Sequence, residues 1–103
     1  MRMMVKFTFG AEGGNEILRS GKINTLLQQV MEDLKPEAAY FYAENGQRSG
    51  HFIIDSEDSV DLVRVCEPLW FGLKADVAMI PVMNGEDIQR GLGELQGIIQ
   101  RYG

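Results

Sequence analysis

The segment Y-F-Y-A-E-N-G-Q-R-S-G-H-F-I-I, from Tyr40 to Ile54, is the clearest guide to the fold of this chain because it predicts two strands around one tight turn. Asn45-Gly46 at its centre is the strongest short signal for a two-residue hairpin, since such a turn needs positive φ at both positions. The flanking residues are rich in aromatic and β-branched side chains, which strands favour. We therefore predict antiparallel strands over residues 38–43 and 50–55.

Pairing about this turn sets which side chains share a face of the hairpin. Directly opposed residues lie on one face, and the faces alternate along each strand. One face collects Ala39, Phe41, Phe52 and Ile54. The other face collects Tyr40, Tyr42, Ser49, His51 and Ile53, with Tyr40 opposite His51. We expect the purely apolar set to face the core and the second set to form an open sheet face.

The residues before the hairpin predict a strand and an amphipathic helix. Val5 and Phe7 alternate with Lys6 and Thr8, as in a strand, which places Lys6 and Thr8 on the open face. Residues 10–14 are glycine-rich and favour a flexible connection, after which a short helical turn over 15–20 is expected, capped by Asn15 and ended by Gly21. Apolar residues at helical spacing over 23–34 predict a helix that stops before a proline.

The residues after the hairpin predict a second helix, a fourth strand and a last helix. Ser56-Glu-Asp-Ser offers a cap for the second helix, Pro68 should kink or restart it, and residues 69–71 should continue its apolar face. Residues 76–82 are expected to form the strand, and Pro81 should lie at a sheet edge because it has no N–H. Asn84 begins a helix with apolar residues on one side and three glycines that weaken it.

The order β-α-β-β-α-β, followed by an extra helix, is the split βαβ or ferredoxin-like pattern of an α+β domain. Its antiparallel sheet has the strand order 4-1-3-2, so the fourth strand is an edge, where Pro81 belongs. The length suits a single domain, residues 1–103.

Composition excludes several classes of function. The net charge is −5 and no basic stripe is present, which disfavours nucleic acid and an anionic membrane surface. No apolar run reaches the roughly 20 residues of a spanning helix. The single cysteine, Cys66, allows no internal disulfide, so we expect a reducing, cytoplasmic location and a buried, inert thiol.

The open face holds the candidate site residues: Lys6, Tyr40, Tyr42 and His51. Exposed half-apolar faces mark interfaces or grooves, and a second copy related by twofold symmetry is the commonest cover, so we predict a homodimer. His51 can serve as an acid–base group or simply bond a tyrosine, and the tyrosines can line a pocket or pack an interface. Lys6 can bind an anion, pair with an acid across the dimer, or lie near the strand end and reach solvent.

No cofactor or metal is expected from the sequence. The glycine-rich segment F-G-A-E-G-G-N matches neither a phosphate loop nor a dinucleotide fingerprint. One histidine and one cysteine leave only carboxylates as ligands, and E-D-S-V-D lacks the spacing of a calcium loop. The acidic residues near 55–61 instead suit the positive end of a helix dipole.

Several segments together resemble small bacterial proteins of unknown function in the dimeric α/β-barrel superfamily. They are M-V-K-F-T-F, K-P-E-A-A-Y-F, E-N-G-Q-R-S-G-H-F, E-P-L-W-F-G-L and I-P-V-M-N-G-E-D-I, within residues 3 to 92. The resemblance implies ferredoxin-like subunits that pair through their open sheet faces. Members of that superfamily include cofactor-free monooxygenases, isomerases, haem enzymes and ligand-sensing domains, and no catalytic motif of theirs carries over to these residues.

Three classes of function follow from this reading. The first is a homodimer that binds a small molecule in a polar and aromatic cavity on the open face. The second is a cofactor-independent enzyme of isomerase or monooxygenase type in the same cavity, with His51 as the acid–base group. The third is a structural protein whose open face serves only assembly.

Overall fold

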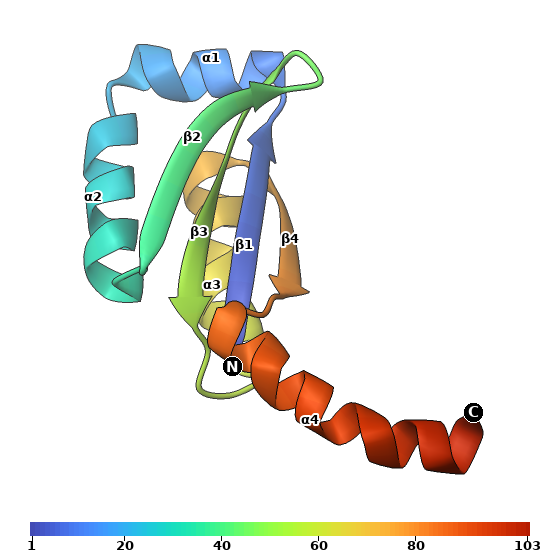
Figure 1. The fold of residues 1–103 in the computed structure, drawn as a ribbon. Coiled ribbons are helices and arrows are strands. Elements are labelled where there is room, and N and C mark those ends of the chain that lie inside the picture. The colour runs from blue at the N-terminus through green and yellow to red at the C-terminus, as the bar shows by residue number, and fades with distance from the viewer.

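The computed structural model describes all 103 residues as an α+β fold with a four-stranded antiparallel sheet and four helices (Figure 1). In chain order the elements are β1 (Arg2–Phe9), α1 (Ala11–Ser20), α2 (Ile23–Leu34), β2 (Ala38–Glu44), β3 (Gln47–Asp55), α3 (Asp61–Glu67), the π-helical turn η1 (Pro68–Gly72), β4 (Asp76–Pro81) and α4 (Gly85–Tyr102). The strands lie in the order β2-β3-β1-β4. Pro81 therefore does lie on an edge strand.

The hairpin of β2 and β3 has the predicted turn and register. Asn45 and Gly46 have φ of 53° and 75°, the left-handed conformation that the turn requires. Tyr40 lies opposite His51, and Phe41 lies opposite Gly50. The two faces inferred from the sequence are therefore the faces of the folded hairpin.

The core lies between the sheet and the helices and is centred on β1 and β3. Its fully buried side chains are Val5, Phe7, Phe52, Leu69 and Leu73. Gly50 shapes this core, because a Cβ there would lie 2.5 Å from the ring of Phe7 and 2.7 Å from the Tyr40 carbonyl oxygen. The missing side chain lets the Phe7 ring lie across β3.

The segment between β1 and α2 differs from the prediction. The glycine-rich residues 11–14 form the first turn of α1 and are not a flexible connection. Gly10 is the N-cap residue, and Asn15 does not cap the helix: its side-chain oxygen accepts a hydrogen bond from Arg48, at 2.9 Å. Gly21 ends the helix in the left-handed conformation, as expected. α1 lies across one end of the sheet and α2 runs beside β2 (Figure 1).

The helix after β3 also differs in detail. Its N-cap residue is Val60, and Ser56 bonds the Asp61 carboxylate at 2.8 Å instead of capping the helix. Pro68 does not break the helix; α3 passes into η1, and Leu69 and Leu73 are buried. Trp70 and Phe71, expected to continue the apolar face, are exposed.

The apolar hairpin face is covered less completely than the sequence suggested. Phe52 is fully buried, whereas Phe41 on the neighbouring strand is 57% exposed. The reason is the placement of α1 and α2, whose side chains line this part of the face without closing over Phe41. Phe41 borders an apolar cavity there.

α4 projects away from the rest of the chain (Figure 1). None of its 18 residues is buried. The radius of gyration is 16.9 Å, against about 13 Å for a compact domain of this length. The accessible surface is 7262 Å², whereas a compact monomer would expose about 5,800 Å². No helix in the structure combines the length and the apolar character that crossing a membrane would require.

Candidate functional site

The four predicted site residues meet on the open face because of the strand register. Tyr40 pairs with His51 across β2 and β3, and Lys6 pairs with His51 across β1 and β3. Tyr42 lies two residues along from Tyr40 and therefore shares its face. On the other side of Lys6 the neighbouring residue is Ala78 of β4, which is small and apolar. The aromatic and charged groups of the open face therefore lie toward β2.

Two tyrosines hold the His51 ring. The Tyr42 hydroxyl lies 2.9 Å from His51 Nδ1, a hydrogen bond that orients the imidazole. The Tyr40 and Tyr42 ring centroids lie 5.4 Å and 5.5 Å from that of His51. The Nε2 atom of His51 and the hydroxyl of Tyr40, whose residue is 59% exposed, have no hydrogen-bond partner within the chain. These two groups can therefore bind a ligand.

Lys6 pairs with an acid of its own chain. Its Nζ lies 2.9 Å and 2.8 Å from the two carboxylate oxygens of Glu44. The hydrogen bond to Glu44 raises the pKa of Lys6, against the opposing effect of desolvation, so the amine stays charged. The pair balances the charge of Lys6 and makes this lysine a poor binder of a free anion.

Glu44 is a site residue that the sequence analysis missed, although the register contained the signal. It follows Tyr42 by two positions and therefore belongs to the open face. Lys6 of β1 lies opposite His51, and Glu44 of β2 lies opposite Gln47. The ion pair between Lys6 and Glu44 therefore crosses β3 near Ser49, which lies between these two positions. Ser49 is only 3% exposed although it lies on this face, and its hydroxyl donates to the Gln47 carbonyl at 3.0 Å.

In a single chain the open face is an exposed surface, called the shelf below, and it has no cavity of its own. The structure has four cavities, and none is lined by Lys6, Tyr40, Tyr42 or His51. A molecule on this shelf would stack on the aromatic rings and bond the free Tyr40 hydroxyl and His51 Nε2. It would be enclosed only if something else covered the face.

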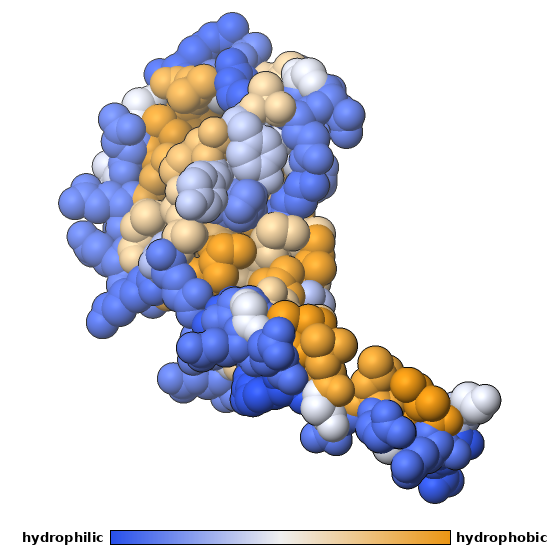
Figure 2. Space-filling view, in the orientation of Figure 1, coloured by the Kyte–Doolittle hydropathy of each residue, from blue (hydrophilic) through white to orange (hydrophobic).

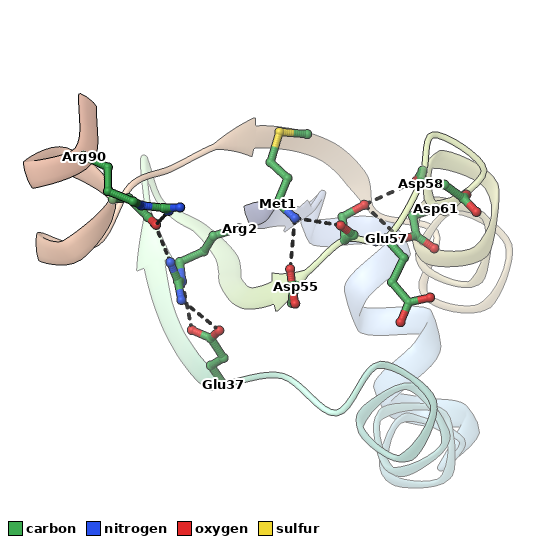
Figure 3. A network of polar contacts seen from close by, with 10 residues as sticks. Met1, Arg2, Glu37, Asp55, Glu57, Asp58, Asp61 and Arg90 are labelled. Atoms are coloured by element: carbon green, nitrogen blue, oxygen red, sulfur yellow. Dashed lines mark hydrogen bonds and ion pairs between the residues drawn. The ribbon is translucent and has the colours of Figure 1, made fainter. Parts of the chain in front are cut away.

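A second polar network fixes the start of α4 (Figure 3). Arg2 forms ion pairs with Glu37 and with Asp87, and Asp87 also accepts a hydrogen bond from Arg90 at 2.5 Å. Asn84 and Asp87 form a capping box, each side chain bonding the backbone N–H of the other. The Asn84 backbone bond and the two arginines lower the pKa of Asp87. The first turn of α4 is thereby tied to β1.

The acidic residues after β3 hold their own loop together. The Asp61 carboxylate accepts bonds from the Ser56 hydroxyl and the Glu57 N–H, and Arg64 bridges Asp61 and Asp58. Figure 3 shows Glu57, Asp58 and Asp61 of this loop, and the contacts of Arg64 lie outside that view. The bond from Ser56, followed by those from Glu57 and Arg64, lowers the pKa of Asp61. These contacts give the cluster a structural role at the start of α3.

Cys66 is 3% exposed in α3, as the apolar sequence around it suggested. Burial raises the pKa of its thiol, and the neighbouring Glu67 adds to the effect. A thiol held protonated in this way is a poor nucleophile.

No protein-family model, curated protein or solved structure matches this chain. The assignment of a function therefore depends on the geometry of the chain itself.

Proposed function

We propose that the protein is a homodimer that binds a small molecule between the open sheet faces of its two subunits, in the manner of the ferredoxin-like dimeric α/β-barrel proteins. The observation that carries the proposal is the exposure of α4 together with the open face. The chain exposes about 1,400 Å² more than a compact monomer of its size. A stable interface buries about 800 Å² on each partner, so a second copy is large enough to account for the excess.

The apolar side of α4 supports a protein partner. Ile88, Leu92, Leu95, Ile99 and Tyr102 follow one another at spacings of four and three residues, which is the seam of a helix that packs on another element. All five are at least 39% exposed, and Figure 2 shows the apolar side chains along one side of the helix. Arg2 and the capping box hold the helix in this projecting direction, where it can lie on another subunit.

A membrane surface is a poorer occupant of this helix. Amphipathic helices that bind membranes carry lysine and arginine on the polar side. α4 has Arg90 and Arg101 against Glu86, Asp87 and Glu94, and the whole chain has a net charge of −5. Anionic lipid would repel this chain, whereas a second copy needs no excess of positive charge.

The ligand that suits the shelf is a neutral, planar molecule with a hydrogen-bonding group. The rings of Tyr40 and His51 offer stacking surface, and the Tyr40 hydroxyl and His51 Nε2 offer one bond each. Lys6 is already paired with Glu44, which disfavours a free anion as the ligand. The second subunit would close the shelf into the cavity that such a ligand needs.

Assembly alone is the second candidate, favoured by the absence of any cavity at this face in the single chain. Multi-angle light scattering tests the common step: we expect a dimer at micromolar concentration, and a monomer would contradict both candidates. A thermal-shift screen of neutral aromatic compounds then tests binding. We expect hits whose shifts fall in Tyr40→Phe and His51→Ala but persist in Lys22→Gln, an exposed control.

The remaining outcomes of this screen separate the candidates. If no compound shifts the melting temperature of a dimeric protein, and the two site variants change only its stability, assembly is the function. If a hit is converted to product, with turnover that depends on pH and is lost in a dimeric His51→Ala variant, the site is that of a cofactor-independent enzyme. Stoichiometric binding without turnover supports the proposal.

A further inference from the structure

A second candidate site lies on the other side of the sheet. A cavity of about 140 Å³, open to solvent on one side, is lined by residues of β1, β2, β3, α1 and α2, and seven of its nine lining residues are hydrophobic. They include Phe9, Ile17, Leu27 and Phe41. Phe41 and Leu18, which are 57% and 47% exposed, lie at its open side. Apolar surface continues from here between α2 and β2 (Figure 2).

Arg48 lies at the rim of this apolar cavity and has no acidic partner. The register places it on the covered face, opposite Phe9 and Ala43. One of its amino groups donates to the Asn15 side-chain oxygen at 2.9 Å, and no carboxylate lies within ion-pair distance. A guanidinium has five N–H donors, so most of those of Arg48 remain free.

Gly14 makes room for this arrangement. A Cβ at this position would lie 2.8 Å from the Arg48 Nη1 atom and 3.4 Å from the Phe9 Cβ, so the end of the arginine side chain would have to shift. With glycine at this position, the guanidinium lies directly against α1 at the edge of the cavity.

We propose that this cavity binds a small aromatic or branched aliphatic carboxylate about the size of benzoate. A hydrophobic cavity of roughly 150 Å³ holds a benzene ring, so a ring of this kind fits among the apolar side chains. The carboxylate then lies against Arg48, whose planar group pairs with two carboxylate oxygens at once. A longer ligand would extend through the mouth beside Phe41. This site is independent of the open face, which lies on the opposite side of the sheet.

The test is a titration of the full chain with benzoate, followed by amide NMR shifts. We expect saturable shifts in α1, α2 and β2 around Ile17, Leu27 and Phe41. Benzyl alcohol, which has the ring without the charge, should bind at least tenfold more weakly. Arg48→Gln should weaken benzoate binding by about tenfold, or about 1.4 kcal/mol. Arg19→Gln, a change at an exposed arginine of α1 that does not line the cavity, should leave it unchanged.

Filling the cavity provides a second variant. Leu27→Phe should abolish benzoate binding while a dispersed NMR spectrum reports a folded chain, and retained affinity in that folded variant would overturn the proposal. Equal binding of benzoate and benzyl alcohol, equal affinity in Arg48→Gln, shifts centred on Tyr40 and His51, or no saturable shift would each overturn it too. Because Arg48 is exposed, its variant should fold even if Leu27→Phe does not.

Discussion

The hairpin core and α4 carry similar apolar side chains but differ in what surrounds them. Phe52 in β3 is fully buried, with Phe7 and Phe41 ring centroids 5.0 Å and 6.3 Å away. Leu92 in α4 is 52% exposed and contacts no core. The apolar side chains of β3 are buried by the rest of the same chain, whereas those of α4 need another surface to cover them. Apolar periodicity thus predicts that a face will be buried, but it does not tell whether the same chain or a partner covers it.

The largest effect is expected in the core. Phe52→Ala removes a fully buried ring and should lower the free energy of unfolding by about 3–5 kcal/mol. Phe41→Ala is the matched control on the neighbouring strand, and its smaller burial should make it cost clearly less. Urea unfolding followed by circular dichroism measures both. An equal cost for the two variants would show that Phe41 is covered in solution.

The next effect concerns α4. Leu95→Glu places a charge in the apolar seam and should dissociate the dimer, because a buried, unpaired carboxylate is costly. Gln100→Glu adds the same charge on the polar side of the helix, about 140° away at 100° per residue, and should leave the dimer intact. Sedimentation velocity of both variants measures the difference. If both remain dimeric, α4 does not form the interface.

The glycines of α4 lie on different sides of the helix. Gly91 lies within the apolar side of the helix, whereas Gly93 lies on the polar side. No atom lies within 4 Å of a Cβ added at either position in the single chain. Gly93→Ala should therefore stabilise the helix by up to about 1 kcal/mol. If the backbone of the partner packs against Gly91, Gly91→Ala should instead weaken dimerisation. Melting temperatures measured over a range of protein concentrations separate a change in helix stability from a change in dimer affinity.

The sequence predicted the elements whose signals are local. The Asn45-Gly46 turn sets the register of β2 and β3, and the Asn84 cap begins α4, because each depends on a few neighbouring residues. The same strand register, together with the alternation of faces along a strand, places Lys6, Tyr40, Tyr42 and His51 on one face. Glu44 was missed because it is the last residue of β2 and reads as part of the turn.

Other features could not be predicted because they depend on helix phase or on distant contacts. The π-helical turn after Pro68 shifts the helical period, so Leu69 and Leu73 turn inward while Phe71 becomes 84% exposed. The cavity beside Arg48 depends on how α1 and α2 lie over β2, which no local pattern specifies. The pairing of Arg2 with Asp87 joins residues 85 positions apart.

The smallest expected effect is the pH dependence of the Asp87 network. The pKa of Asp87 is lowered in the folded chain, so its carboxylate stabilises the fold above the ordinary value of 3.8, and this stabilisation is lost as the pH falls through the lowered pKa. Asp87→Asn should therefore be less stable than the unmodified chain at pH 7. The gap between their urea midpoints should close as the pH falls below 4. Glu94→Gln, a change on the same helix away from this network, should show no such convergence. If the difference in urea midpoint between Asp87→Asn and the unmodified chain stayed constant with pH, the ion pairs of Asp87 with Arg2 and Arg90 would not stabilise the base of α4.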